Sequence, residues 1–141
     1  MTREPEPASE PDLVDTLAHT AFVVTGALTR IAAEHDVSLT LVRVLGILRD
    51  HRRRMAELAE RVGVDRSTMS GLVDRAEQRG LLARHPDPDD RRSVRVDITP
   101  EGRALAVRIY GQLSAELAPL IARVPEGRRA GLAAELEQLL D

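Results

Sequence analysis

The sequence predicts a mainly α-helical fold with a small β-hairpin wing (α+β), a winged helix-turn-helix between N- and C-terminal helices. Apolar residues recur every three or four positions over most of the chain, as in amphipathic helices. Two short helical segments meet at Gly63, and residues 93–98 alternate apolar and polar residues like a half-buried strand. Aromatic residues make up 1% of the 141 residues, so the core must consist of Leu, Val, Ile and Ala.

The chain is expected to begin with a disordered tail over residues 1–11, which are rich in proline and acidic residues. A long helix is predicted from Asp12 to about Glu34, and Ser38 is a suitable N-cap for a second helix. The run "DHRRR", residues 50–54, interrupts the apolar pattern. We therefore expect it to be a short polar connector.

A helix-turn-helix is predicted next. Residues 55–62 have the apolar face of a two-turn helix, and Gly63 stands where a helix C-cap takes a positive φ. Asp65 can cap a second helix over about residues 66–79, which Gly80 ends. Two short helices joined by such a tight turn are typical of this motif.

A hairpin and two further helices complete the prediction. Residues 81–85 and 93–98 are expected to be strands, with "PDPDDR" as the loop between them. Thr99 can cap a helix that starts at Pro100, and Pro119 is expected to kink or break that helix. A last helix should start at Pro125.

Charge is distributed unevenly along the chain. The net charge is −3, but residues 1–42 carry −5, residues 43–108 carry +4 and residues 109–141 carry −2. All 20 basic residues are arginine. A basic middle between acidic flanks points to nucleic acid as the partner of the middle region.

Several other classes of protein are disfavoured. The chain has no cysteine, which excludes disulfides and thiol redox sensing. It lacks a GxSxG elbow, a Gly-rich phosphate loop and an HExxH motif, so we expect neither an enzyme nor a cofactor. Residues 85–90 group His and Asp side chains, but the prolines there favour a turn over a metal site. No apolar run is long enough to span a membrane, and the acidic start is unlike a signal peptide, so we expect a cytoplasmic protein.

The stretch "DRRSVRVDITPEG" resembles the wing signature of the MarR family of bacterial transcription regulators, and "LAERVGVDRSTMSGLVDRAEQRGLLAR" is similar to that family's helix-turn-helix. The resemblance covers roughly residues 12–140. It implies a homodimer that binds palindromic operator DNA, often as a repressor that a small-molecule effector releases. The domains would be a dimerisation helix over 12–37, a DNA-binding region over 38–99 and dimerisation helices over 100–141. The alternative is a winged-helix protein-interaction module that does not bind DNA.

The second helix of the motif is the candidate reader of the major groove. Arg66, Ser67, Thr68 and Ser70 can reach base edges or phosphates from its first turns. Gly71 departs from family members that carry a long base-reading side chain there, and predicts either a closer approach of the helix or a weaker direct readout. We expect Arg75 to contact phosphate; a solvated salt bridge is the alternative.

The wing is the candidate for minor-groove contact. Arg91 and Arg92 lie at the predicted tip, and arginine suits the negative potential of a narrow minor groove. The nearby aspartates, Asp90 included, are expected to shape the turn and to orient the arginines. The resemblance further implies an ion pair between Arg92 and Asp65. Arg53 and Arg54 can contact the DNA backbone or form part of a solvated charge run.

Overall fold

The computed structural model describes residues 10–140, so most of the tail predicted for residues 1–11 lies outside the described residues. Six helices and three strands occur in the described range. Their bounds are α1 Leu13–Glu34, α2 Leu39–Leu48, β1 Arg53–Arg54, α3 Met55–Val62, α4 Arg66–Gln78, β2 Leu82–Pro86, β3 Val94–Ile98, α5 Pro100–Ile121 and α6 Glu126–Glu137. The winged helix-turn-helix predicted from the sequence is therefore confirmed.

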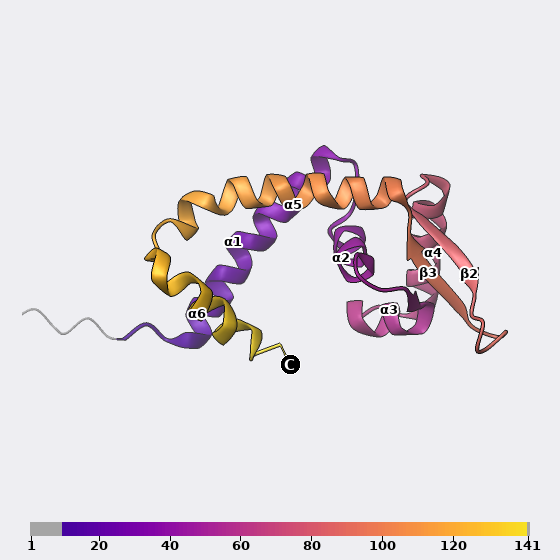
Figure 1. Ribbon diagram of the computed structural model, residues 1–141, viewed down its shortest axis with the longest axis horizontal. Coiled ribbons are helices and arrows are strands. Elements are labelled where there is room, and N and C mark those ends of the chain that lie inside the picture. Colours follow the sequence, from indigo (N-terminus) through magenta and orange to yellow (C-terminus); the bar gives the residue numbers. More distant parts are fainter. Residues whose placement is uncertain (1–9, 141) are drawn as a thin grey trace, which may run out of the picture.

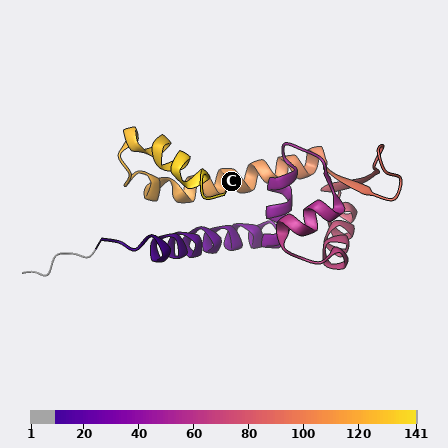
Figure 2. The same ribbon diagram turned by 90° about the horizontal axis from the view of Figure 1, so that it is seen from below.

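The molecule is elongated, with two different ends. Helices α2, α3 and α4 gather at one end, and the β2–β3 hairpin projects beyond them (Figure 1). The long helices α1 and α5 extend from this end to the other, where α6 folds back (Figure 2). Helix α5 starts directly after the wing and continues into the opposite end, so it connects the two parts of the molecule.

Side chains that cap helix N-termini set most helix starts, as the sequence indicates. Asp12 accepts a hydrogen bond from the amide of Val14, and Ser38 accepts one from the amide of Leu41. Thr99 does the same for α5 through the amide of Gly102. Each cap satisfies an amide that the first helical turn leaves unpaired.

The sheet has three antiparallel strands in the order β1-β3-β2. The two hairpin strands begin one residue later than predicted. The connector predicted for residues 50–54 is wrong in part, because Arg53 and Arg54 pair with Val96 and Arg95 as strand β1. This two-residue strand exists only through its pairing with β3, and no local periodicity can reveal it.

The hydrophobic core found among residues 10–140 lies inside the winged helix-turn-helix and reaches the adjoining parts of α1 and α5. Its buried members include Ile31, Ala32, Val44, Leu45, Leu48, Leu58, Met69, Val73, Leu82, Val96, Leu105 and Ile109. Gly102 allows α5 to join this core closely, because a Cβ there would lie 2.1 Å from the carbonyl oxygen of Leu81. Helix α6, by contrast, contains no buried residue.

The two proline predictions near the C-terminus hold only in part. Helix α5 runs through Pro119 and ends two residues later at Ile121, so the break follows the proline instead of coinciding with it. A proline leaves the carbonyl four residues earlier without its main-chain partner and crowds it, which is consistent with the helix ending within one turn of Pro119. Pro125 occupies the N-cap of α6. None of the helices in the described range is long and apolar enough to cross a membrane.

Candidate nucleic-acid interface

A glycine and a capping aspartate build the turn between α3 and α4. Gly63 has a φ of 80°, a left-handed conformation that favours glycine, and its amide bonds to the carbonyl of Ala59. Asp65 accepts a hydrogen bond from the amide of Thr68 at 2.7 Å. That bond is the main reason why the pKa of the Asp65 carboxyl lies below its ordinary value. The start of α4 is thus fixed relative to α3.

Helix α4 buries one face and presents the other to solvent. The buried face consists of Met69, Leu72, Val73 and Ala76. The predicted contact residues of this helix all lie outside that face: Arg66, Ser67, Thr68 and Arg75 are exposed, and Ser70 and Gly71 are half-buried. A Cβ at Gly71 would meet only the flexible end of Arg75, at 3.5 Å, so packing does not require glycine at this position.

The wing tip carries two adjacent exposed arginines, Arg91 and Arg92. Asp90 shapes this turn, because its carboxylate accepts hydrogen bonds from the amide of Arg92 and the hydroxyl of Ser93, each at 3.0 Å. The expectation that an aspartate forms the turn is confirmed for Asp90. The carboxylate holds the backbone of Arg92 and not its guanidinium.

Asp87 holds arginines at the base of the wing. Asp87 is 1% exposed, and its carboxylate lies 2.7 Å from Nε of Arg54 and 3.1 Å from Nε of Arg95. The amide of Asp89 donates a third contact at 3.0 Å. That amide, with the charges of Arg54 and Arg95, keeps the pKa of Asp87 below its ordinary value against the opposing effect of burial. The aspartates therefore orient Arg54 and Arg95, and not the tip arginines as predicted.

One further expectation requires correction, and the structure shows the surroundings of Arg53 and Arg54. No ion pair between Arg92 and Asp65 occurs in the described part of the chain, where the Asp65 carboxylate caps α4. Arg54 is engaged by Asp87, and Arg53 lies 4.0 Å from Glu57 while forming part of β1. The structure thus places Arg53 and Arg54 in the scaffold that supports the wing, with their guanidinium groups already next to carboxylates.

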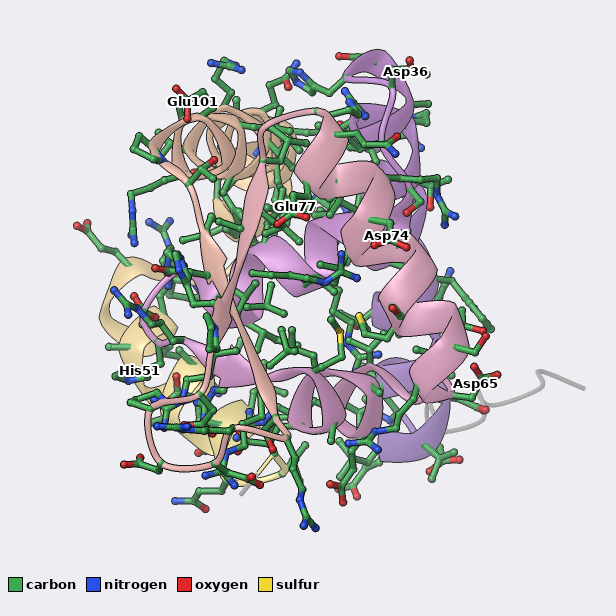
Figure 3. All side chains as sticks on the ribbon, turned by 90° about the vertical axis from the view of Figure 1, so that its right-hand side faces the viewer. Asp36, His51, Asp65, Asp74, Glu77 and Glu101 are labelled. Carbon is green, nitrogen blue, oxygen red and sulfur yellow. The ribbon has the colours of Figure 1, made fainter. Side chains whose placement is uncertain are left out.

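Arg84 is a residue of this region that the sequence analysis missed. It lies on β2 and contacts α4 through Asp74, Glu77 and Ser70. Figure 3 looks onto α4 and the hairpin, with Asp74 and Glu77 on α4 and Asp65 nearer its other end. The alternation of residues along β2 places Arg84 on the same face of the strand as Leu82. In the sequence, only this alternation indicated that Arg84 could face α4.

Two sets of arginines around the motif differ in their partners, whereas Arg43 and Arg79 donate to backbone carbonyls. Arg52, Arg53, Arg54, Arg84 and Arg95 lie in ion pairs with carboxylates. Within residues 10–140, neither an ion pair nor a hydrogen bond engages the guanidinium groups of Arg66, Arg75, Arg91 and Arg92, and all four residues are exposed. This second set lies on α4 and at the wing tip, and in the described range the exposed guanidinium of Arg61 on α3 is likewise unengaged. A helix-turn-helix with available arginines on its second helix and at the wing tip is typical of winged-helix DNA-binding proteins.

Comparisons with known proteins agree with this class. Residues 35–93 match the model of the MarR family. The chain is 33% identical over 116 residues to the transcriptional repressor NicR of Pseudomonas putida, covering 74% of this chain and 73% of NicR. Among solved structures, wild-type apo MarR from E. coli is 21% identical with a TM-score of 0.78, covering 95% of this chain and all of that one. NadR in complex with 4-hydroxyphenylacetate is 18% identical with a TM-score of 0.76, covering 96% and 97%.

The chain therefore belongs to the MarR family of winged helix-turn-helix transcription regulators. The names of its relatives are those of regulators and not of enzymes.

Proposed function

We propose that the protein is a homodimeric, sequence-specific DNA-binding repressor that a small-molecule effector releases from its operator. The observation that carries the proposal is the set of available guanidinium groups on α4 and the wing tip, next to a hydroxyl-rich first turn of α4. Other arginines of the same region are neutralised by carboxylates. Arginines left available on α4 and at the wing tip, beside arginines that carboxylates neutralise, fit a polyanion such as DNA.

In the proposed complex, α4 enters the major groove. Ser67, Thr68, Ser70 and Gly71 face base edges, while Arg66 and Arg75 contact phosphates. Arg91 and Arg92 at the wing tip reach the adjacent minor groove, and Asp90 holds their turn in shape. Arg53 and Arg54 contribute through the scaffold of the wing.

The dimer is proposed to form through the helices of residues 12–37 and 100–141. An apolar groove of about 470 Å³ lies between α1 and α5, and its lining includes Val23, Leu117 and Ile121. Helix α6 exposes Leu132 and Leu136 without burying any residue. A two-fold dimer places its two α4 helices about one DNA turn (~34 Å) apart, which predicts a pseudo-palindromic operator.

Release by an effector is supported by the likeness to NadR, whose solved structure contains 4-hydroxyphenylacetate. An effector that binds better to a conformation with a different spacing of the α4 helices lowers the population that fits both half-sites.

Selection of genomic fragments with the purified protein tests the proposal. We expect enrichment of a pseudo-palindrome, bound by two chains, with an affinity that falls steeply between two salt concentrations because phosphate contacts release counterions. Adding small aromatic acids such as 4-hydroxyphenylacetate to the complex tests for release. A folded protein that enriches no sequence over random DNA would favour the protein-interaction module instead.

A further inference from the structure

Arg84 belongs to β2, but both terminal nitrogens of its guanidinium contact residues of α4. Its side chain is 26% exposed, and Nη1 forms an ion pair with Asp74 and lies 3.5 Å from Oε1 of Glu77. Nη2 lies 3.2 Å from the carbonyl oxygen and 3.2 Å from the hydroxyl oxygen of Ser70. The main chain of Arg84 also bonds to α4, because its amide donates to Oε2 of Glu77 at 2.9 Å.

This contact sets the direction of hydrogen bonding at Ser70. A guanidinium only donates, so the Ser70 oxygen is the acceptor and its own proton stays available. Thr16, Thr20 and Thr29 of α1 donate their hydroxyl protons to the carbonyl four residues earlier, at 2.7–2.9 Å. Ser70 makes no such bond within the described range, so its proton can be donated outside the chain.

The same guanidinium also adjusts the charge of α4. Asp74 and Glu77 are exposed carboxylates on a helix that the proposed function places against DNA (Figure 3). Unpaired, they would repel phosphates. Because Arg84 lies against both, the helix presents less negative charge to a nucleic acid.

We propose that Arg84 is a positioning residue that orients the Ser70 hydroxyl as a donor to a hydrogen-bond acceptor on a base edge in the major groove. The proposal rests on the proposed function, since it assumes that α4 reads DNA. The matching acceptors are N7 or O6 of guanine, N7 of adenine and O4 of thymine. Arg84 therefore acts on sequence preference through Ser70 and does not touch the base itself.

The test measures affinity for the enriched site and for each single base-pair variant of one half-site. Ser70→Ala is expected to lose about 2- to 10-fold of discrimination at one base pair, the range of a single hydrogen bond. Arg84→Met combined with Asp74→Asn keeps the net charge of the wild type while removing the contact to Ser70. We expect it to lose discrimination at the same base pair, and the triple variant with Ser70→Ala to lose no more.

Retained discrimination in the charge-matched variant, or losses that add up in the triple variant, would overturn the proposal. Thermal unfolding of each variant verifies folding. If the double variant does not fold, Arg84→Lys replaces it in the test. A single ammonium cannot span Asp74 and Ser70 as the guanidinium does. The Arg84→Lys variant should therefore lose the same base preference. The proposed function fails separately, if the wild type itself enriches no site.

Discussion

The two ends of the molecule differ in how they are stabilised. At the winged helix-turn-helix end, α2, α3, α4 and the sheet enclose a core with fully buried side chains such as Leu45 and Met69. At the other end, α6 buries nothing, and Leu120, Ile121, Leu132 and Leu136 are each 38–48% exposed. One end has its apolar surface covered within a single chain, and the other does not.

This difference separates two physical tasks. Burial inside one chain stabilises the motif that carries α4 and the wing, whatever the protein concentration. Apolar surface left exposed along neighbouring helices is a feature of association sites. The DNA-binding end should therefore respond to substitutions in its stability, and the helical end in its self-association.

The same substitution at both ends gives the largest expected effect. Leu45 is 1% exposed, so Leu45→Ala should lower the free energy of unfolding by about 2–5 kcal/mol. Leu136 is 40% exposed, so Leu136→Ala should act mainly by weakening the dimer. Urea unfolding at several protein concentrations distinguishes the two, because only an effect on association depends on concentration. A wild-type midpoint that does not change with concentration would contradict the proposed dimer.

A smaller effect is expected at the wing tip. Arg92→Ala should weaken operator binding by about 1–3 kcal/mol, because one cation is lost from the groove. Unfolding should be unaffected, since the Arg92 side chain is exposed and makes no ion pair within residues 10–140. Arg108→Ala on α5 is the control for removing one exposed arginine away from the proposed contact with DNA, and it should weaken operator binding less than Arg92→Ala does. Equal affinities for the Arg92 variant and the control would remove the wing from the proposed interface.

Substitution of Gly71 should change the stability of the fold and the affinity for DNA in opposite directions. Alanine is the better helix former, so Gly71→Ala should raise the free energy of unfolding by about 0.5–1 kcal/mol. The added methyl group should lower operator affinity if α4 approaches DNA closely there. Gly111→Ala on α5, where a Cβ would also meet no obstacle, should stabilise without changing affinity. If both variants bind DNA like the wild type, the close-approach interpretation of Gly71 is wrong.

The smallest expected effect is a change in how stability depends on pH. The folded pKa of Asp87 lies below its ordinary value, so the folded state releases this proton more readily. Its contribution to stability is complete above the ordinary aspartate pKa of about 4, and is lost as the pH falls through the lower folded pKa. Denaturant titrations between about pH 5 and pH 3 should show a shallower decline for Asp87→Asn than for the wild type. Parallel declines would argue against Asp87 as the titrating group.

The sequence predicted the elements well because their signals are local. Caps such as Asp65 and Ser38 and the positive φ at Gly63 depend on neighbours within a few residues. The apolar face of α4 follows from helical periodicity. Local rules also placed Arg91 and Arg92 at the tip of a turn.

Long-range partners were not predictable in this way. Arg54 and Asp87 are 33 residues apart, and Arg84 meets Ser70 across 14. Which arginine contacts which carboxylate depends on the register of β1, β2 and β3, and several pairings are compatible with the same pattern of charges. For the same reason the implied pairing of Arg92 with Asp65 was wrong, and the supporting role of Arg84 was missed.

The continuity of α5 has a mechanical consequence. Its 22 residues make a rod about 33 Å long, and Gly102 seats one end of it directly against the base of the wing. A rod of that length converts a small rotation at its far end into a larger displacement: tilting it by about 5° moves the near end by about 3 Å. A tilt of that size at the helices distant from the motif would therefore move the wing, so in the proposed dimer the separation of the two wings would depend on how those helices fit together.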